Sequence, residues 1–314
     1  MGDVIHSLPA LTDAQRAIPN LQVDWVVEPA FAEIPKWHSA VRKVIPFALR
    51  QWRKAPFSLQ TRQQWQAFKA ELQAKRYDAV IDAQGLLKSA LFATRLAQGT
   101  KYGYDRHSIR EPLASLFYDK TYGINYQQHA VERIRQLFAQ TLGYALPKMI
   151  GDYGIAENIA QFAKKSENST TCTPYILAIH ATTRADKHWS EQAWSALFTM
   201  LEAKGLEIHL PWGNPIERER AERLAQHSAH IKVLPKLTLT ELAVEILQAQ
   251  AVVSVDTGLS HLTASLDKPN VILYGATDPN LIGGYGKAQE YVVAKGMENI
   301  LPQHVFERLT AISP

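Results

Sequence analysis

The segment Val252–Leu266, with the sequence VVSVDTGLSHLTASL, decides the fold of this chain. It begins with Val252–Val255, a short run of mostly β-branched side chains, which predicts a buried strand. Asp256–Gly258 predicts a tight turn, and a helix is expected to begin at once over Leu259–Leu266. A strand that runs through a turn into a helix is typical of the parallel sheets of α/β proteins.

The turn after this strand has the composition of a phosphate site. The first N–H groups of a helix have no partner within the helix, and this end carries partial positive charge. Gly258 lets the backbone approach a ligand closely, and Thr257 and Ser260 can add hydroxyl donors. His261 lies in the first helical turn. The alternative is a helix that is merely capped, with Asp256 or Thr257 as the N-cap residue.

A second junction of the same form lies earlier in the chain. The expected strand Tyr175–Ile179 runs into His180–Trp189, with the sequence HATTRADKHW, before another helix. Lys187 supplies a compact positive charge suited to a leaving diphosphate, and Thr182 and Thr183 supply hydroxyl donors. The alternative is a solvated loop that ends in a buried tryptophan. Two such junctions in one half of the chain together favour a diphosphate site.

Length and composition place the chain among globular proteins. Its 314 residues, 46% apolar and 20% charged, predict two domains at about 150 residues per domain. The single cysteine, Cys172, excludes an intramolecular disulfide and a thiolate metal cluster, which favours the cytoplasm. No apolar run reaches the length of about 20 residues that spans a bilayer, and Met1–Val4 does not begin a signal peptide.

Short apolar runs alternate with amphipathic stretches along the chain, which predicts parallel α/β folding in both halves. The expected strands are Val23–Val27, Lys43–Ala48, Ala79–Ala83, Tyr175–Ile179, Glu207–Leu210, Val252–Val255 and Val271–Tyr274. The expected helices include Arg62–Ala74, Ala130–Leu142, Glu191–Ala203, Ile216–Ala225 and Leu239–Gln248. Gly143–Gly154 is rich in glycine and has no period, so the domains are expected to span residues 1–150 and 151–314.

Several site classes have no signature in this sequence. It contains no Asp-x-Asp pair, no cysteine pair and no close cluster of histidines and carboxylates, so we expect no metal. It also contains no Gly-x-Gly-x-x-Gly and no P-loop, which argues against dinucleotide oxidoreductases and P-loop NTPases, and we expect no cofactor. The charge of a phosphate must then be met by lysine, arginine and helix N-termini.

Five motifs make the sequence resemble a known family: Met1–Val4, Asp82–Leu86, Lys187–Trp189, Asp256–His261 and Tyr274–Pro279. They resemble the bacterial ADP-heptose lipopolysaccharide heptosyltransferases over nearly the whole chain. Arg110–Tyr118 and the basic, aromatic Arg50–Lys54 look most like the members that add the first heptose to the Kdo residue of the inner core.

The resemblance implies a GT-B fold, in which two Rossmann-like domains face each other across a cleft. The N-terminal domain would bind Kdo-lipid A and the C-terminal domain ADP-heptose, and the last helix could pack back on the N-terminal domain. Transfer of L-glycero-D-manno-heptose would invert the anomeric carbon without a metal. The enzyme would be cytoplasmic and peripheral on the cytoplasmic face of the inner membrane, with no nucleic acid as partner.

The resemblance also implies roles for individual residues. Asp3 is the candidate general base, and Lys187 would stabilise the departing ADP. The donor-binding residues would be Thr182, Thr183 and Lys187 with Thr257 and Gly258 at the diphosphate, Glu217 at the ribose, and Asp256 and His261 at the sugar and phosphate end. The acceptor carries carboxylates and phosphates, which could be bound by Arg50, Arg53, Lys54, Lys88, Arg110, His129 and Arg133.

The sequence departs from the family at its start. Relatives place a strand and a hydroxyl-rich turn before the Met-Gly-Asp motif, whereas Met1 is the first residue here. A missing first strand would be central, so its neighbours would lack ladder partners and the base would lie at a frayed terminus. We therefore expect a truncated start with poor folding or activity.

Three other functions remain open from the sequence. A later-acting ADP-heptose transferase would differ in its acceptor alone. A non-hydrolysing nucleotide-sugar epimerase shares the GT-B fold and needs no acceptor. A nucleic-acid-binding module would fit the net charge of +4, but the chain has no recognisable nucleic-acid motif.

Overall fold

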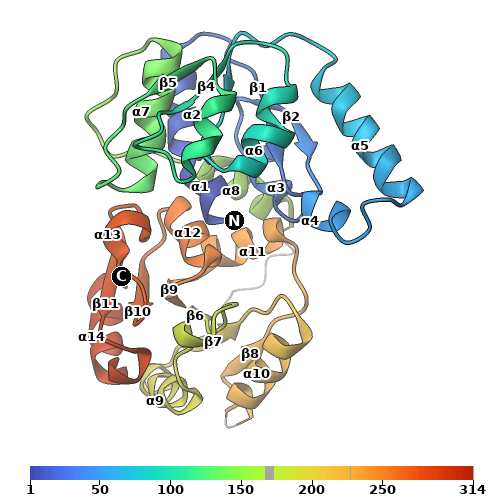
Figure 1. Ribbon diagram of the computed structural model, residues 1–314. Helices are drawn as coiled ribbons and strands as arrows, with labels where there is room; N and C mark the ends of the chain where they lie inside the picture. Colours follow the sequence, from blue (N-terminus) through green and yellow to red (C-terminus); the bar gives the residue numbers. More distant parts are fainter. Residues whose placement is uncertain (167–172, 227, 314) are drawn as a thin grey trace. The chain divides into compact units, whose positions relative to one another are not determined.

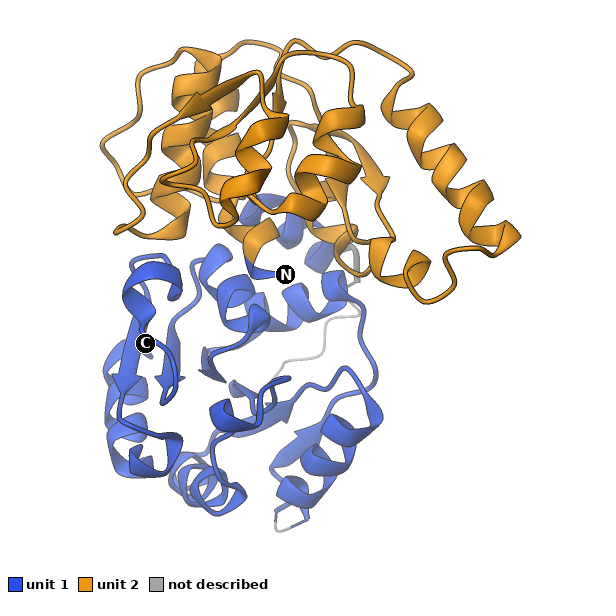
Figure 2. Ribbon diagram, viewed as in Figure 1, with its two compact units in different colours: residues 1–2, 155–314 blue, residues 3–154 orange. Residues whose placement is uncertain are grey.

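The computed structural model describes residues 1–166, 173–226 and 228–313, so Cys172 lies outside the described residues. The chain forms two compact units (Figures 1 and 2). Unit 1 comprises Met1–Gly2 and Ile155–Pro314, and unit 2 comprises Asp3–Gly154. Each unit is an α/β structure built on parallel strands.

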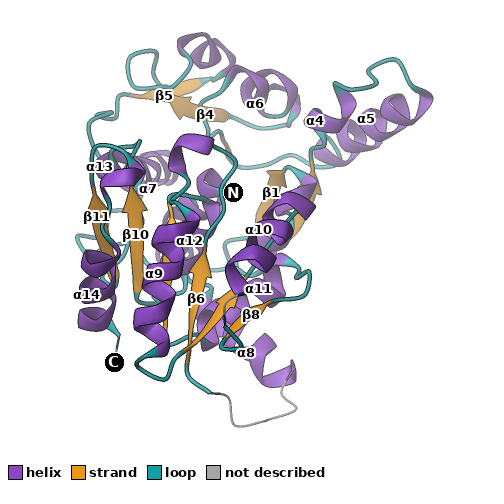
Figure 3. Ribbon diagram, turned by 90° about the horizontal axis from the view of Figure 1, so that it is seen from below, coloured by secondary structure: helices purple, strands orange, loops and turns teal. Residues whose placement is uncertain are grey.

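Unit 1 contains a six-stranded parallel sheet with the order β11-β10-β9-β6-β7-β8 (Figure 3). Its strands are β6 (Tyr175–Ile179), β7 (Glu207–Leu210), β8 (Ile231–Val233), β9 (Ala251–Val255), β10 (Asn270–Tyr274) and β11 (Gln289–Val293). Every residue of β6, β9 and β10 is buried. A parallel sheet that helices cover on both faces has such strands, which explains their largely apolar sequences.

Helices of unit 1 pack in two groups. One group is α9 (Glu191–Glu202) with α10 (Pro215–Ala225) and α14 (Pro302–Ile312). The other is α11 (Leu239–Gln248) with α8 (Ala156–Ser166) and α12 (Gly258–Ser265). The short elements are α13 (Pro279–Ile282) and the 3-10 turns η4 (Ala185–Lys187) and η5 (Met297–Asn299).

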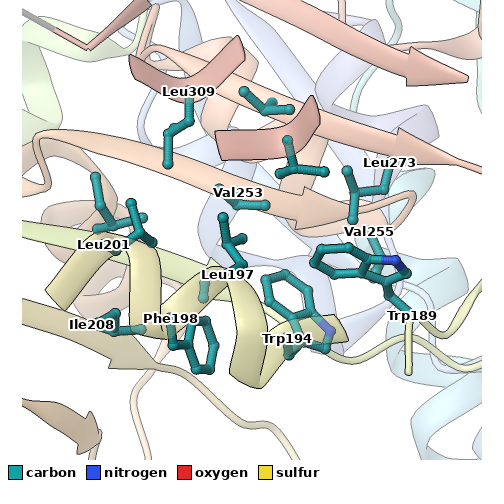
Figure 4. Close-up of a cluster of buried hydrophobic side chains, with 14 of the residues drawn as sticks. Trp189, Trp194, Leu197, Phe198, Leu201, Ile208, Val253, Val255, Leu273 and Leu309 are labelled. Atoms are coloured by element: carbon teal, nitrogen blue, oxygen red, sulfur yellow. The ribbon is translucent and has the colours of Figure 1, made fainter. Parts of the chain in front are cut away.

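The core of unit 1 lies between α9, α14 and the sheet (Figure 4). Trp189 and Trp194 meet edge to face with their ring centroids 5.0 Å apart. The last helix, α14, adds Val305 and Leu309 to the same core. It therefore packs on the sheet of its own unit, where its apolar face is buried.

Unit 2 holds its strands in two separate groups. β1 (Val23–Val27) pairs with β2 (Val41–Pro46), while β3 (Val80–Ile81), β4 (Lys101–Tyr104) and β5 (Lys120–Tyr122) form a three-stranded sheet. Its helices are α1 (Gly2–His6, which starts in unit 1), α2 (Leu8–Ala17), α3 (Glu33–Lys36), α4 (Leu49–Trp52), α5 (Leu59–Leu72), α6 (Leu87–Phe92) and α7 (Ala130–Leu142). Three 3-10 turns complete it: η1 (Pro29–Phe31), η2 (Thr94–Leu96) and η3 (Pro112–Phe117).

The element order of unit 2 repeats that of unit 1 with one strand fewer. In unit 1, the central β6 joins the β7-β8 side of the sheet to the β9-β10-β11 side. In unit 2, β1-β2 and β3-β4-β5 take the corresponding places, and no strand within the described residues joins them. β1 and β3 are largely half-buried, unlike β6 and β9.

Most predicted elements are present, several with unchanged bounds. The strand Val23–Val27 and the helix Ala130–Leu142 match their predictions at both ends. The strand predicted over Ala79–Ala83 is reduced to Val80–Ile81, the two residues that pair with β4. The sequence did not predict β4, β5, β8 or β11, since these strands mix polar residues into runs of three to five residues.

A buried ion pair joins α2 to α7 in unit 2. The Nε of Arg135 donates to the Asp13 carboxylate at 2.6 Å, and the two side chains are 2% and 3% exposed. Arg135 also donates to Glu132 on its own helix at 2.9 Å and to the main-chain oxygen of Pro147 at 3.2 Å. This one side chain therefore holds three segments of the unit together.

We expect Arg135→Met to lower the free energy of unfolding by about 3–5 kcal/mol, because it leaves the Asp13 charge buried without its partner. Urea denaturation followed by circular dichroism measures the loss. The matched control is the double variant Asp13→Leu/Arg135→Met, which removes both charges and should recover most of the stability. If the single and the double variants are equally unstable, the ion pair is not the source of the loss.

Candidate functional site

The two strand-to-helix junctions that the sequence predicts lie side by side in unit 1. β6 and β9 are hydrogen-bonded neighbours, with Ile179 opposite Ser254. Both strands therefore end at the same edge of the sheet, and the segments His180–Trp189 and Asp256–Gly258 leave it together. The carboxyl edge of a parallel sheet is the usual place for a ligand in α/β proteins.

Asp256 is the point at which three loops of this edge meet. Its Oδ2 lies 2.5 Å from the Nζ of Lys187, and the two side chains are 6% and 14% exposed. The hydroxyl of Thr277, in the loop after β10, donates to the same oxygen at 2.6 Å. The hydroxyl of Thr182 donates to the main-chain oxygen of Asp256 at 3.5 Å. Lys187 is thus held beside the turn before α12.

The helix after β9 begins at Gly258, one residue before the predicted start, with Thr257 as its N-cap residue. The hydroxyl of Ser260 donates to the main-chain oxygen of Thr257 at 2.6 Å. Of the two N-cap residues that the sequence offers, the structure has Thr257. The carboxylate of Asp256 bonds to Lys187 instead of to the helix.

The first two residues of the chain pack against the start of α12. A Cβ atom on Gly258 would lie 2.9 Å from the Cβ of Met1, so a larger residue there would displace Met1. A Cβ atom on Gly2 would lie 3.1 Å from the Cδ2 of His261, whose side chain is buried. These contacts fix the His261 ring under the N-terminal segment.

Two predicted donor residues do not join the contacts around Asp256. Thr183 is exposed in the loop after β6. Glu217 lies in the first turn of α10, where its carboxylate accepts a bond from the N–H of Gly213 at 2.7 Å. The N–H of Glu217 in turn donates to the side chain of Asn214 at 3.1 Å. The Glu217 carboxylate therefore stabilises the start of α10.

The sequence did not single out two histidines that support the loop after β6. A ring nitrogen of His188, Nε2, lies 2.7 Å from the main-chain oxygen of Thr182. His180 is fully buried where β6 ends, and this burial lowers its pKa to about 3. Its side chain is therefore neutral at physiological pH and adds no charge below the loop.

The candidate base lies in unit 2. Asp3 is exposed in α1, and its Oδ2 accepts a hydrogen bond from the Nε2 of Gln84 at 3.2 Å. The hydroxyl of Ser7 donates to the main-chain oxygen of Asp3 at 2.9 Å. Gln84 comes from the Asp82–Leu86 motif, to which the sequence gave no role.

The predicted acceptor-binding cations fall into two sets. The exposed set, on α4 and directly after it, on α6 and in the loop before η3, is Arg50, Arg53, Lys54, Lys88 and Arg110. The remaining two have bonds within the unit: His129 is the N-cap of α7, and Arg133 donates to the main-chain oxygen of Ser108 at 2.8 Å. The guanidinium of Arg133 also lies 4.0 Å from the ring centroid of Tyr126.

Unit 1 has a cavity of about 560 Å³ beyond the carboxyl ends of β7 and β8, which none of the predicted residues lines. Its lining residues are Trp212, Arg218, Glu222, Val233, Leu234, Pro235 and Lys236. The Arg218 guanidinium lies 5.4 Å from the ring centroid of Trp212. The lining residues come from two separate segments of the chain, 212–222 and 233–236. A local sequence motif therefore cannot predict this cavity.

The described residues contain neither a metal-binding cluster nor a membrane-spanning helix. Within residues 1–166, 173–226 and 228–313, no group of three or more His, Cys, Asp or Glu side chains could hold a metal ion. None of the helices in this part of the chain is long and apolar enough to cross a membrane.

The family model described as glycosyltransferase family 9 (heptosyltransferase) matches residues 65–307. The chain belongs to glycosyltransferase family 9. It is therefore a glycosyltransferase, and the resemblance that the sequence motifs indicate is confirmed. Its fold is GT-B, as the sequence predicts.

Relatives within the family are similar over nearly their full length. The chain is 54% identical to lipopolysaccharide heptosyltransferase 1 of Escherichia coli, over 99% of this chain and 97% of the relative. The structure of E. coli heptosyltransferase WaaC with ADP matches with a TM-score of 0.94 at 54% identity, covering 99% of this chain and 97% of that chain. The same enzyme with ADP-2-deoxy-2-fluoro heptose matches with a TM-score of 0.91 at 52% identity, covering 99% and 96%.

Proposed function

We propose that this family 9 enzyme transfers L-glycero-D-manno-heptose from ADP-heptose to the Kdo residue of Kdo-lipid A, as the first heptose of the lipopolysaccharide inner core. The observation that carries the proposal is the half-buried Lys187, bonded to Asp256 beside the N-terminus of α12. A lysine and a helix N-terminus at one strand edge suit a diphosphate. The E. coli relative with ADP-2-deoxy-2-fluoro heptose supports an ADP-heptose donor.

The diphosphate has a consistent set of partners in unit 1. Lys187 can exchange the Asp256 carboxylate for a phosphate oxygen, since the two are similar anions. The Thr257 and Gly258 backbone and the hydroxyls of Thr182 and Thr183 would supply further donors. Asp256 and His261 would then bind the heptose and phosphate end of the donor, and Glu217 would bind the ribose.

The chemistry proposed is a direct displacement that inverts the anomeric carbon and needs no metal. One carboxylate, Asp3, takes the proton of the acceptor hydroxyl as its oxygen bonds to the anomeric carbon. The bond from that carbon to the ADP oxygen breaks at the same time, and Lys187 stabilises the negative charge on the departing ADP. A single displacement places the new bond on the opposite face of the sugar.

The acceptor is anionic, and unit 2 has exposed cations suited to it. Kdo and lipid A carry carboxylates and phosphates, which arginine can bind through two parallel hydrogen bonds. Arg50, Arg53 and Lys54 are exposed around the end of α4, and Lys88 and Arg110 are exposed elsewhere in the unit. His129 and Arg133 would contribute from the first turn of α7.

The position proposed for the enzyme is the cytoplasmic face of the inner membrane, without a membrane-spanning segment. The support is a surface on which cations and apolar side chains are mixed. Phe57 and Leu59 are 85% and 72% exposed, close in sequence to Arg53 and Lys54. Cations can bind anionic lipid headgroups while apolar side chains insert at the interface. The acceptor should therefore be presented in vesicles.

The decisive experiment measures ADP release from ADP-heptose with and without Kdo-lipid A in anionic vesicles. We expect release that requires Kdo-lipid A, together with a heptosylated product. Release only with an acceptor that already carries heptose would favour a later-acting ADP-heptose transferase. Conversion of ADP-heptose without any acceptor would favour an epimerase, and no turnover with ADP-independent binding to nucleic acid would contradict an enzyme of this class.

We expect Lys187→Ala to lower kcat by about 10²–10³-fold, the usual cost of removing one group that stabilises developing charge. The measurement is steady-state ADP release at saturating Kdo-lipid A. Lys204→Ala is the matched control, because Lys204 is an exposed lysine of the same unit, outside the predicted site. Equal loss in both variants would show that the effect is not specific to the diphosphate.

We expect Asp3→Asn to lower transfer by at least about 10²–10⁴-fold while ADP-heptose binding stays unchanged, because the amide cannot accept the proton. Turnover is measured by ADP release, and donor binding by isothermal titration. The amide oxygen can still accept the Gln84 hydrogen bond, so the local structure should be retained. Turnover equal to that of the unchanged protein would remove Asp3 as the base.

A further inference from the structure

The Asp82–Leu86 motif is built around a buried carboxylate. Asp82 is 4% exposed, and its Oδ1 accepts bonds from the N–H groups of Gln84 and Gly85 at 3.0 and 3.1 Å. Its Oδ2 accepts bonds from the hydroxyls of Ser89 and Tyr118, each at 2.9 Å. The hydroxyl of Thr94 adds a longer bond of 3.3 Å. Asp82 thus ties its own loop to α6, η2 and the segment before β5.

The end of the Asp82–Leu86 loop that leads into α6 is fixed as well. Gly85 has a φ of +65°, and a Cβ atom there would lie 2.8 Å from the Cγ1 of Ile109. The N–H of Leu87, which starts α6, donates to the Glu111 carboxylate at 2.6 Å. Because both ends of the loop are held, the backbone of Gln84 between them is held too. A rigid support of this kind is what a precisely placed side chain needs.

From this loop the Gln84 side chain reaches the Asp3 carboxylate, with Nε2 3.2 Å from Oδ2. We propose that Gln84 is a positioning residue for Asp3, and that the buried Asp82 anchors it. The inference rests on the proposed function, in which Asp3 takes the proton of the acceptor hydroxyl. Gln84 does not touch the reacting atoms in this role; it acts through the Asp3 carboxylate.

The physical need for such a residue follows from where Asp3 lies. An exposed carboxylate samples several rotamers, and a misplaced base loses rate because proton transfer requires a defined geometry. A hydrogen bond from an amide restricts the carboxylate to one orientation.

Gln84→Leu tests the inference, because leucine is of similar size and cannot donate. We expect kcat to fall about ten- to a hundredfold, with unchanged KM for ADP-heptose and unchanged Tm. The fall should be confined to kcat, since the donor-binding residues of unit 1 are unchanged. Gln84→Glu should lower kcat further, because a second carboxylate then faces Asp3.

The loss must be specific to the glutamine that faces Asp3. Gln63→Leu is the matched control, because Gln63 is an exposed glutamine on α5 in the same unit.

The outcomes separate this inference from the proposed function. If Asp3→Asn abolishes transfer while Gln84→Leu keeps kcat, Asp3 is the base and the positioning role is refuted. Loss of activity in Gln84→Leu with a lowered Tm also refutes it, since Gln84 is then merely structural. If Asp3→Asn retains full turnover, Asp3 is not the base. The proposed role of Asp3 is then refuted, and the positioning role of Gln84 is refuted with it.

Discussion

The pairing of β6 with β9 is the constraint on which the candidate donor site depends. These strands are 70 or more residues apart in the chain, yet they are parallel neighbours in the sheet. Their common direction puts the loop with Lys187 beside the turn with Asp256. Burial of the apolar side chains of β6 and β9 holds the two strands side by side. It therefore also determines where the charge of Lys187 lies.

The charge of Lys187 is paired with the Asp256 carboxylate, because neither charge is well solvated. A lysine with 14% exposure is costly to leave unpaired, and Asp256 at 6% exposure would be costlier still. Thr277 donates to Asp256 and remains available to it when Lys187 moves to another anion. When Lys187 leaves Asp256, the carboxylate thus keeps the hydrogen bond from Thr277.

Much of unit 1 could be predicted from the sequence because its central strands are short, mostly apolar runs. The bounds of the strand Tyr175–Ile179 were predicted without error, and both strand-to-helix junctions were located. The roles of Thr277 and Gln84 were not found, because each contacts a residue far away in the chain. The strand Lys101–Tyr104 was missed for a different reason, since KYGY contains a glycine and no apolar run. The residue roles that the family resemblance implies stay predictions.

The split sheet of unit 2 bears on how the protein behaves in solution. In the described part of the chain, β1 and β3 each have a strand partner on one side alone. The other side of each presents main-chain N–H and C=O groups that can template a strand from another molecule. In unit 1 the edge strands of the sheet are β8 and β11. Unit 2 has two further edge strands, β1 and β3, because its strands form two separate groups. These two further edges give unit 2 additional places at which self-association by strand pairing can begin.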